Sequence, residues 1–392
     1  MRTLTQNIQV SLEYDVYLTK APISPSTPFL SDLFPKKAPA TRVWVVIDSG
    51  LRSMASELTK RIELVMKYAG KSWQLSEAPV WLPGGQEFKA NPAAWQDLRA
   101  GIQHNQLDRH ALIWAIGGGA FLDTVGYVAG TTHGGIPVLK TPSTLLSMFE
   151  TSGAIKNAIH SKRPDFQSVY APPKAILLDM SLLESIDDET WREGLIGALR
   201  MGIAYDHRIY DFIEDNLEGI VNRSSKAAEE LIYRVNQLQI DLLRARDPFE
   251  RHNRQVHGFG IWATQKLLEL TDFQLSYAKA LIVGVALDIA YSMHADVISE
   301  SCCIKALSMF RDLGYDLYVP ELSSYMSLPD HEESIAKGLE EYRQEIGGKL
   351  ALQLPTTIGQ NRYVEDIDLS ILRASIRYLM AWQAQPHEAK YG

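Results

Sequence analysis

The segment Ala111-Leu-Ile-Trp-Ala-Ile-Gly117-Gly118-Gly119-Ala-Phe-Leu-Asp123 decides the fold class of this chain. Its first six residues are all apolar, which is typical of a strand buried in a parallel sheet. Three glycines follow at once and open a helical pattern. Such a turn lets backbone N–H groups approach a pyrophosphate, although a tight strand-to-helix turn also needs glycine. The spacing differs from the usual G-x-G-x-x-G, so nucleotide binding and a purely structural turn both stay open.

Strands and helices alternate on both sides of this segment, which predicts a doubly wound parallel sheet. Strand patterns occupy residues 8–18, Val43–Ile47, Val80–Leu82 and Pro137–Thr141, and helical patterns occupy Ser53–Tyr68 and Pro92–His104. The strand over Val43–Ile47 ends in a turn that begins with Asp48. Lys140 is interpreted as a surface residue.

Helical patterns dominate after about residue 182. They cover Ser185–His207, Ala227–Ala245, Gly258–Glu269, Tyr277–His294 and Cys302–Leu313, and a strand pattern returns at Leu350–Leu354. A charged segment from Glu332 to Ile346 is interpreted as a helix with a solvated face. We therefore predict an α/β domain over residues 1–182 and an α-helical domain over residues 183–392.

Composition narrows the class of protein. A chain of 392 residues with 46% hydrophobic residues suits two globular domains, and the net charge of −8 argues against a nucleic-acid partner. The cysteines, Cys302 and Cys303, are adjacent and cannot build a CxxC zinc site or a disulfide framework. No signal peptide and no membrane insertion are expected, so a cytoplasmic location is predicted.

Several further motifs occur in a fixed order along the chain. They are Pro83-Gly-Gly-Gln-Glu-Phe-Lys89, the Gly117–Asp123 turn, Pro142-Ser-Thr144, a loop with Glu150, Lys156 and His160, Trp191–Arg200, Asp247-Pro-Phe-Glu250, Phe259-Gly-Ile-Trp262 and Tyr277–Gly284. In this order and spacing they resemble the dehydroquinate synthase, or sugar phosphate cyclase, family. The Asp-Pro-Phe-Glu and Phe-Gly-x-Trp variants resemble one cyclase-like branch of it.

The resemblance implies a Rossmann-like nucleotide-binding domain followed by the helical metal and substrate domain of the family. It implies NAD as a cofactor, a divalent metal, and a sugar phosphate or related polyol as substrate. The cofactor-binding residues would be Asp48, Gly84, Gly85, Lys89, Gly117, Gly118, Gly119, Asp123 and Thr144. The catalytic residues would be Glu150, Lys156, His160 and Arg200. It also implies a homodimer, or a heteromer with a paralogue.

The chain departs from the family pattern where the metal ligands belong. The three ligand positions fall on Gly197, Ile261 and Tyr277, of which Gly and Ile cannot bind a metal and neutral Tyr binds zinc poorly. No divalent metal is expected, and the metal-dependent, phosphate-eliminating cyclisation becomes doubtful. A relocated metal site near His252 and His257 is an alternative.

Substrate positions also differ from the family. Gly134 and Gln255 replace arginines, Gln265 replaces a histidine, His160 replaces an asparagine, and Arg200 replaces a lysine. The losses fall on the substrate and metal side, while the cofactor side is largely kept.

Three functions follow as hypotheses. The first is an NAD-using enzyme that works without the metal, with Lys156, Arg200, His160 or Tyr277 as acid–base groups. The second is a catalytically inactive homologue that serves as partner or regulatory subunit of an active paralogue. The third, an ordinary dehydroquinate synthase, is the weakest because its metal ligands are missing.

Overall fold

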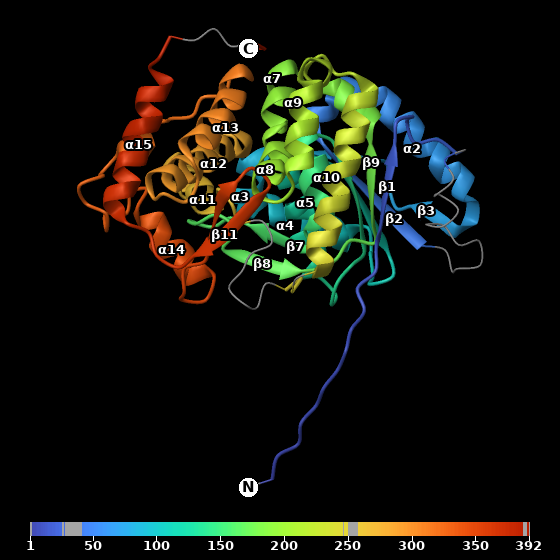
Figure 1. The fold of residues 1–392 in the computed structure, drawn as a ribbon. Coiled ribbons are helices and arrows are strands. Elements are labelled where there is room, and N and C mark those ends of the chain that lie inside the picture. Colours follow the sequence, from blue (N-terminus) through green and yellow to red (C-terminus); the bar gives the residue numbers. More distant parts are fainter. Residues whose placement is uncertain are drawn as a thin grey trace.

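We describe a computed structural model of the chain, which covers residues 2–25, 27, 41–245, 247–249, 258–386 and 390–391. Within these residues no helix is long and apolar enough to cross a membrane. One part of the molecule is built on a large sheet and the other mostly on helices (Figure 1).

The large sheet has the strand order β1-β9-β6-β5-β2-β3. The short strand β4 pairs with the C-terminal part of β2, after the residues of β2 that pair with β3. Its strands are β1 (Asp15–Thr19), β2 (Thr41–Asp48), β3 (Trp73–Leu75), β4 (Val80–Leu82), β5 (Leu112–Gly117), β6 (Val138–Pro142) and β9 (Ala175–Asp179). Every pairing is parallel. The doubly wound α/β fold predicted from the strand and helix alternation is therefore confirmed.

Both faces of the sheet are covered, since side chains alternate along each strand. Val43, Val45 and Ile47 of β2 pack with Leu58 and other residues of α2. Trp44 and Val46 pack on the opposite face against α3, α4 and α5. These helices are α2 (Ala55–Ala69), α3 (Gly85–Ala90), α4 (Pro92–His104) and α5 (Gly119–Gly130), followed by α6 (Leu145–Glu150). Burial on both faces explains the continuous apolar strands.

The helical part begins after β9 and a short 3-10 helix, Met180–Ser185. It contains α7 (Asp188–Gly194), α8 (Ile196–Ala204), α9 (His207–Val221), α10 (Ser225–Ala245), α11 (Ile261–Leu270), α12 (Tyr277–His294), α13 (Glu300–Asp312), α14 (Lys337–Glu345) and α15 (Leu369–Gln383). Two small antiparallel hairpins complete the fold, β7 (Lys156–Ile159) with β8 (Gln167–Tyr170) and β10 (Leu352–Thr357) with β11 (Gln360–Val364). Helix α12 lies inside this part, with Ala280 to Ser292 all buried.

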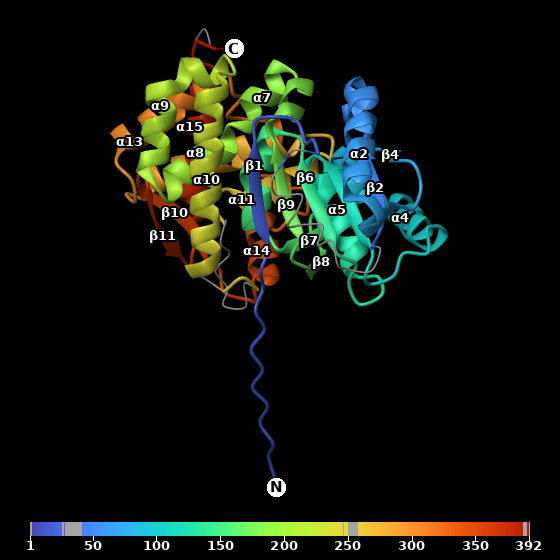
Figure 2. The same ribbon diagram turned by 90° about the vertical axis from the view of Figure 1, so that its right-hand side faces the viewer.

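Two expected elements differ in the structure, and one helix was not expected. The strand pattern over residues 8–18 becomes a strand only at Asp15–Thr19, because its partner β9 offers five residues, and the chain before it runs away from the body (Figures 1 and 2). The pattern Ser185–His207 is divided among a 3-10 helix, α7 and α8, and Asp206 starts the new helix α9 by accepting from the Arg208 N–H. Helix α15 was missed.

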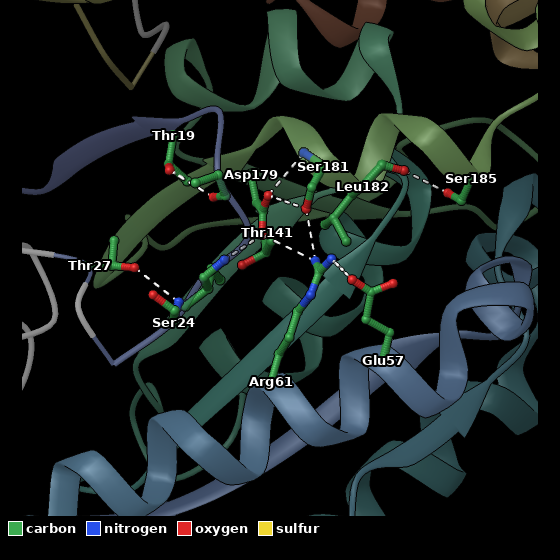
Figure 3. Close-up of polar contacts among 12 residues, drawn as sticks. Thr19, Ser24, Thr27, Glu57, Arg61, Thr141, Asp179, Ser181, Leu182 and Ser185 are labelled. Atoms are coloured by element: carbon green, nitrogen blue, oxygen red, sulfur yellow. Dashed lines mark hydrogen bonds and ion pairs between the residues drawn. The ribbon is translucent and has the colours of Figure 1, made fainter.

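The carboxylate of Asp179 joins three segments at the end of β9 (Figure 3). It accepts hydrogen bonds from the Ile23 N–H at 3.2 Å, from the Ser181 N–H at 3.0 Å and from the Ser181 hydroxyl at 2.6 Å. Arg61 of α2 donates to the same hydroxyl at 2.8 Å. Burial raises the pKa of Asp179, and these donors offset part of the rise. The contacts fix α2 and the N-terminal segment against the end of β9.

Candidate functional site

A cavity of about 490 Å³ lies where the carboxyl ends of the central strands face the helical part. Asp48 is the last residue of β2, Gly118 and Gly119 follow β5, and Thr144 follows β6. Arg200 and Tyr277 reach the cavity from α8 and α12 in the helical part. The open crevice at the carboxyl ends of parallel strands is the usual ligand site of such sheets.

Most of the predicted site residues line this one cavity. They are Asp48, Gly85, Lys89, Gly118, Gly119, Asp123, Thr144, Glu150, Lys156, His160, Arg200, Ile261 and Tyr277. Gly84, Gly117 and Gly197 are not part of its lining. The structure therefore brings together the residues predicted for the cofactor and those predicted for catalysis.

The glycine residues of the turn have two different reasons to be glycine. A Cβ at Gly117 would lie 2.6 Å from the Phe121 ring and 2.8 Å from the Asp48 Cβ, and one at Gly84 would lie 2.1 Å from an Asp48 carboxylate oxygen. Packing alone requires those two glycines. A Cβ at Gly118 or Gly119 would come no closer than 3.7 Å to any other group, so only cavity space would be lost. Gly118 and Gly119 leave room for a ligand.

The N-terminus of α5 opens into that space. Gly118 is its N-cap and has no side chain to satisfy the first N–H groups of the helix. Helix α5 has twelve residues, so its dipole and free N–H groups favour an anion here. Asp48 accepts from the Gly50 N–H at 2.9 Å and the Gly118 N–H at 3.5 Å, while burial raises its pKa.

Lys89 forms ion pairs with two carboxylates in the lining of the cavity. Its Nζ lies 2.8 Å from an Asp123 oxygen and 2.6 Å from an Asp165 oxygen. Burial alone would lower the pKa of Lys89, but the two carboxylates outweigh it and raise the pKa. The pKa of Asp165 falls to about 2, since Lys89 outweighs its burial. Sequence reasoning missed Asp165, because its position after a proline indicated only a turn. The structure shows that turn, with Asp165 at φ 51°.

His160 has both ring nitrogens engaged. Its Nδ1 accepts from the Asp165 N–H at 3.0 Å, so Nε2 carries the proton and donates to the Gln86 side-chain oxygen at 2.8 Å. Burial and the nearby Lys89 lower the pKa of His160 to about 3. The ring stacks on Phe273 with centroids 4.7 Å apart. Its geometry is that of a neutral histidine that positions the loop rather than of a proton donor near neutral pH.

Lys140 was expected on the surface and is buried instead, with 2% of its area exposed. It sits in β6, at the centre of the sheet, and its side chain lines the cavity. Nζ donates to the Asn157 side-chain oxygen at 2.6 Å. Burial lowers the pKa of Lys140, and the neighbouring Lys89 lowers it further. A lysine inside a strand of apolar residues was the available signal.

Arg200 and Glu150 form a buried ion pair where α8 meets the end of α6. The guanidinium donates to Glu150 at 2.7 Å, and 3% of the Arg200 side chain is exposed. Burial raises the pKa of Glu150, although Arg200 opposes the rise. Tyr277, at the first turn of α12, lies close enough that both groups act on it, and burial together with Glu150 raises its pKa well above its usual value. Tyr277 therefore keeps its proton near neutral pH.

Lys156 and Glu345 lie side by side in the lining of the cavity. The Nζ and Oε1 atoms lie 3.5 Å apart, and Glu345 also hydrogen-bonds to the Gln265 side chain. Glu345 is the last residue of α14, the helix that was expected to be merely solvated. Helix α14 packs on α11, and Glu345, exposed at the end of the helix, also lines the cavity. Its charged sequence gave no hint of which carboxylate would face the cavity.

Two family models match the chain in sequence. The 3-dehydroquinate synthase N-terminal model matches residues 79–193, and the 3-dehydroquinate synthase C-terminal model matches residues 194–333. The chain belongs to the dehydroquinate synthase family. A 3-dehydroquinate synthase of Pyrobaculum aerophilum is 27% identical over 68% of this chain and 75% of its own length. A 2-epi-valiolone synthase of Actinosynnema mirum is 23% identical over 88% of this chain and 87% of its own.

Solved structures of sugar phosphate cyclases share the fold. The 2-epi-5-epi-valiolone synthase ValA of Streptomyces hygroscopicus, with NAD+ and Zn2+ bound, superposes with a TM-score of 0.84 at 20% identity and covers 97% of this chain and 100% of its own. A 2-deoxy-scyllo-inosose synthase, complexed with carbaglucose-6-phosphate, NAD+ and Co2+, gives 0.72 at 18% identity over 93% and 96%. The predicted fold of a Rossmann-like domain followed by a helical domain is thereby confirmed.

The family's metal does not fit the residues of this member. A Cβ at Gly197 would lie 2.8 Å from Leu146 and 3.3 Å from Phe149, so the space for a ligating side chain is filled. Ile261 and Tyr277 offer no metal-binding nitrogen or carboxylate. Within the described ranges, no group of three or more His, Cys, Asp or Glu side chains is placed to hold a metal ion. His252 and His257 lie outside the described residues.

Proposed function

We propose that this member of the dehydroquinate synthase family binds NAD and catalyses hydride transfer on a hydroxylated substrate without the family's metal. The carrying observation is one cavity that joins the open glycine cradle of Gly118 and Gly119 to the ion pair of Arg200 and Glu150 and to Tyr277. The proposal differs from the metal-dependent, phosphate-eliminating cyclisation of the family.

The N-terminus of α5 would hold the pyrophosphate of NAD against Gly118 and Gly119, and Asp48, Gly85, Lys89, Asp123 and Thr144 surround the rest of the cradle. Thr144 caps α6 and accepts from the Ser147 N–H at 3.2 Å, which fixes the loop around the cofactor. NAD, when bound, supplies a hydride acceptor for a substrate alcohol, or a hydride donor in its reduced form.

The residues of the helical part would handle the substrate oxygen and its proton. Arg200 carries a permanent positive charge and would stabilise negative charge on that oxygen, the role that a metal has in other family members. Tyr277 keeps its proton and donates a hydrogen bond to the same oxygen. Glu150, with its pKa raised by burial, would accept the hydroxyl proton during oxidation. Each group is drawn from a different element, α8, α12 and α6.

Calorimetric titration of the purified, metal-stripped protein, first with NAD and then with zinc, tests this function. We expect NAD to bind and zinc not to bind. A Gly118→Val variant provides the matched control, because it fills the cradle. Zinc binding at micromolar affinity would show a metal site that the described residues do not contain and would contradict the metal-free proposal. Binding of neither would contradict NAD use and favour the partner or regulatory subunit role.

A further inference from the structure

The cationic side chains that line the cavity, among the described residues, are already engaged. They are Lys89, Lys140, Lys156 and Arg200. Two carboxylates hold Lys89, Glu150 holds Arg200, and Glu345 faces Lys156. Lys140 donates to the Asn157 amide, and burial lowers its pKa. A negatively charged ligand would therefore compete with a carboxylate for Lys89, Lys156 or Arg200.

The lining also has an excess of acidic groups. Among the described residues, the carboxylates of the lining are Asp48, Asp123, Glu150, Asp165, Glu193 and Glu345, six against the four cations. A phosphate monoester carries a charge of roughly −1.5 to −2 near pH 7. In a partly buried cavity, repulsion between such a dianion and a nearby carboxylate is much stronger than in water. Outside the cofactor cradle, the described lining has four carboxylates, Glu150, Asp165, Glu193 and Glu345, against three cations, and this excess opposes a phosphate ester on the substrate side.

The pair formed by Lys156 and Glu345 determines which group fits there. The side chain of Glu345 is 30% exposed and that of Lys156 26%, so both reach the cavity while remaining partly desolvated. Burial raises the pKa of Glu345, and Lys156 counteracts this rise. A carboxylate accepts hydrogen bonds and an ammonium donates them, so the pair suits neighbouring hydroxyl groups. Gln265, which hydrogen-bonds Glu345, adds a neutral donor and acceptor.

We propose that Glu345 excludes phosphate esters and that the substrate of this cavity is an unphosphorylated polyol or hydroxyketone, bound through its hydroxyl groups by Lys156 and Glu345. The reaction of this substrate rests on the proposed hydride-transfer function. The exclusion of phosphate esters by Glu345 does not depend on that function. Glu345 acts here as a specificity-determining residue, because its carboxylate occupies the cation that a phosphate would need.

Titration calorimetry with glucose 6-phosphate tests the exclusion. The titrations compare NAD-saturated wild-type protein, Lys156→Met, Glu345→Gln and the double variant Glu345→Gln/Lys156→Met. We expect no binding by the wild type at millimolar concentration, at least about tenfold tighter binding by Glu345→Gln, and loss of that gain in the double variant. Glu340→Gln is the control, since Glu340 lies on the same helix, pairs with Arg343 at 2.8 Å and has a side chain that is 37% exposed. It should leave the wild-type behaviour unchanged.

Two results would overturn the exclusion by Glu345. One is binding of glucose 6-phosphate by the wild type that is lost in Lys156→Met. The other is absence of any gain in Glu345→Gln. If NAD does not bind, the proposed function fails, but the same comparison can be made without NAD. Binding of the phosphate at the glycine turn would give all variants the same affinity. It would therefore not produce the gain in affinity expected for Glu345→Gln.

Discussion

Gly117 and Gly118 are adjacent, yet a side chain would meet different surroundings at each position. At Gly117 it would run into Phe121 and Asp48, whereas at Gly118 it would enter the cavity. The φ angle of Gly118 is −71°, which any residue can adopt. Substitution at the two positions can therefore separate the stability of the turn from its capacity to bind a cofactor.

We predict that Gly118→Val weakens NAD binding by at least about tenfold while the unfolding free energy falls by no more than about 1 kcal/mol, because valine is a poorer N-cap residue than glycine. Gly117→Ala should destabilise the protein by about 1–3 kcal/mol, because the added methyl group overpacks the turn. Calorimetric NAD titration and urea unfolding of both variants provide the measurements. Equal loss of stability in the two variants would show that the glycines serve only the turn.

His160 shows how a sequence match can fall on a residue with another role. The family resemblance predicts a catalytic role for His160. Its ring is neutral, because burial and the nearby Lys89 lower its pKa, and its two nitrogens are hydrogen-bonded to Gln86 and to the Asp165 N–H. Lys89 and Gln86 lie more than seventy positions earlier in the sequence. His160 remains a predicted site residue, and its geometry assigns it to positioning the Asp165 loop.

Helices α11 and α12 are joined by a buried carboxylate. Asp288 of α12 accepts from the Gly260 N–H at 2.7 Å and from the Trp262 indole N–H at 2.8 Å. Gly260, at φ 78°, is the N-cap of α11, so this contact satisfies a backbone N–H at the helix start. The same two helices supply Ile261 and Tyr277 to the cavity, so Asp288 sets their relative position. Burial raises the pKa of Asp288 to about 7.

This raised pKa predicts a pH-dependent contribution to stability. The folded state holds the Asp288 proton more tightly than the unfolded chain, so stability from this group is greatest below about pH 4 and falls as pH rises towards 7. The loss amounts to as much as about 4 kcal/mol. Urea unfolding of the wild type and Asp288→Asn between pH 4 and 7 should show a steeper decline in the wild type, since the other buried carboxylates titrate in both proteins. Parallel pH profiles would contradict the prediction.

The cavity depends on the sheet and the helical part together. The cofactor cradle belongs to the turns after β2, β5 and β6, whereas Arg200, Gln265 and Tyr277 come from α8, α11 and α12 (Figures 1 and 2). A ligand that fills both sides therefore links the two parts in the folded state. The domain boundary after residue 182 and the homodimer or heteromer remain predictions.

We predict that NAD at one hundred times its dissociation constant stabilises the protein by about 2.7 kcal/mol, because it binds only the folded chain. The metal-free proposal predicts that removal of metal leaves the stability of the protein unchanged. Thermal unfolding of the chelator-treated and untreated protein, each with and without NAD, gives both comparisons. A lower melting temperature after chelation would contradict the metal-free site.

The sequence alone determined the parallel sheet, the glycine turn and the family, since these depend on local apolar runs and on motifs in a fixed order. Helix α4 and helix α12 have the predicted bounds because Asn91 and Ser276 supply local caps. The family resemblance places the metal-ligand positions on Gly197, Ile261 and Tyr277, and the absence of a metal remains a prediction.

Only the tertiary structure decided the charge state and the partners of the cavity residues. Burial of Lys140, the two carboxylates on Lys89 and the approach of Glu345 to Lys156 join residues that are distant in sequence or hidden in a strand. Local propensity carries no information about such contacts, because they arise when separate elements pack. Desolvation and pairing in that packing fix the pKa values, and so they decide which groups can bind charge or exchange protons.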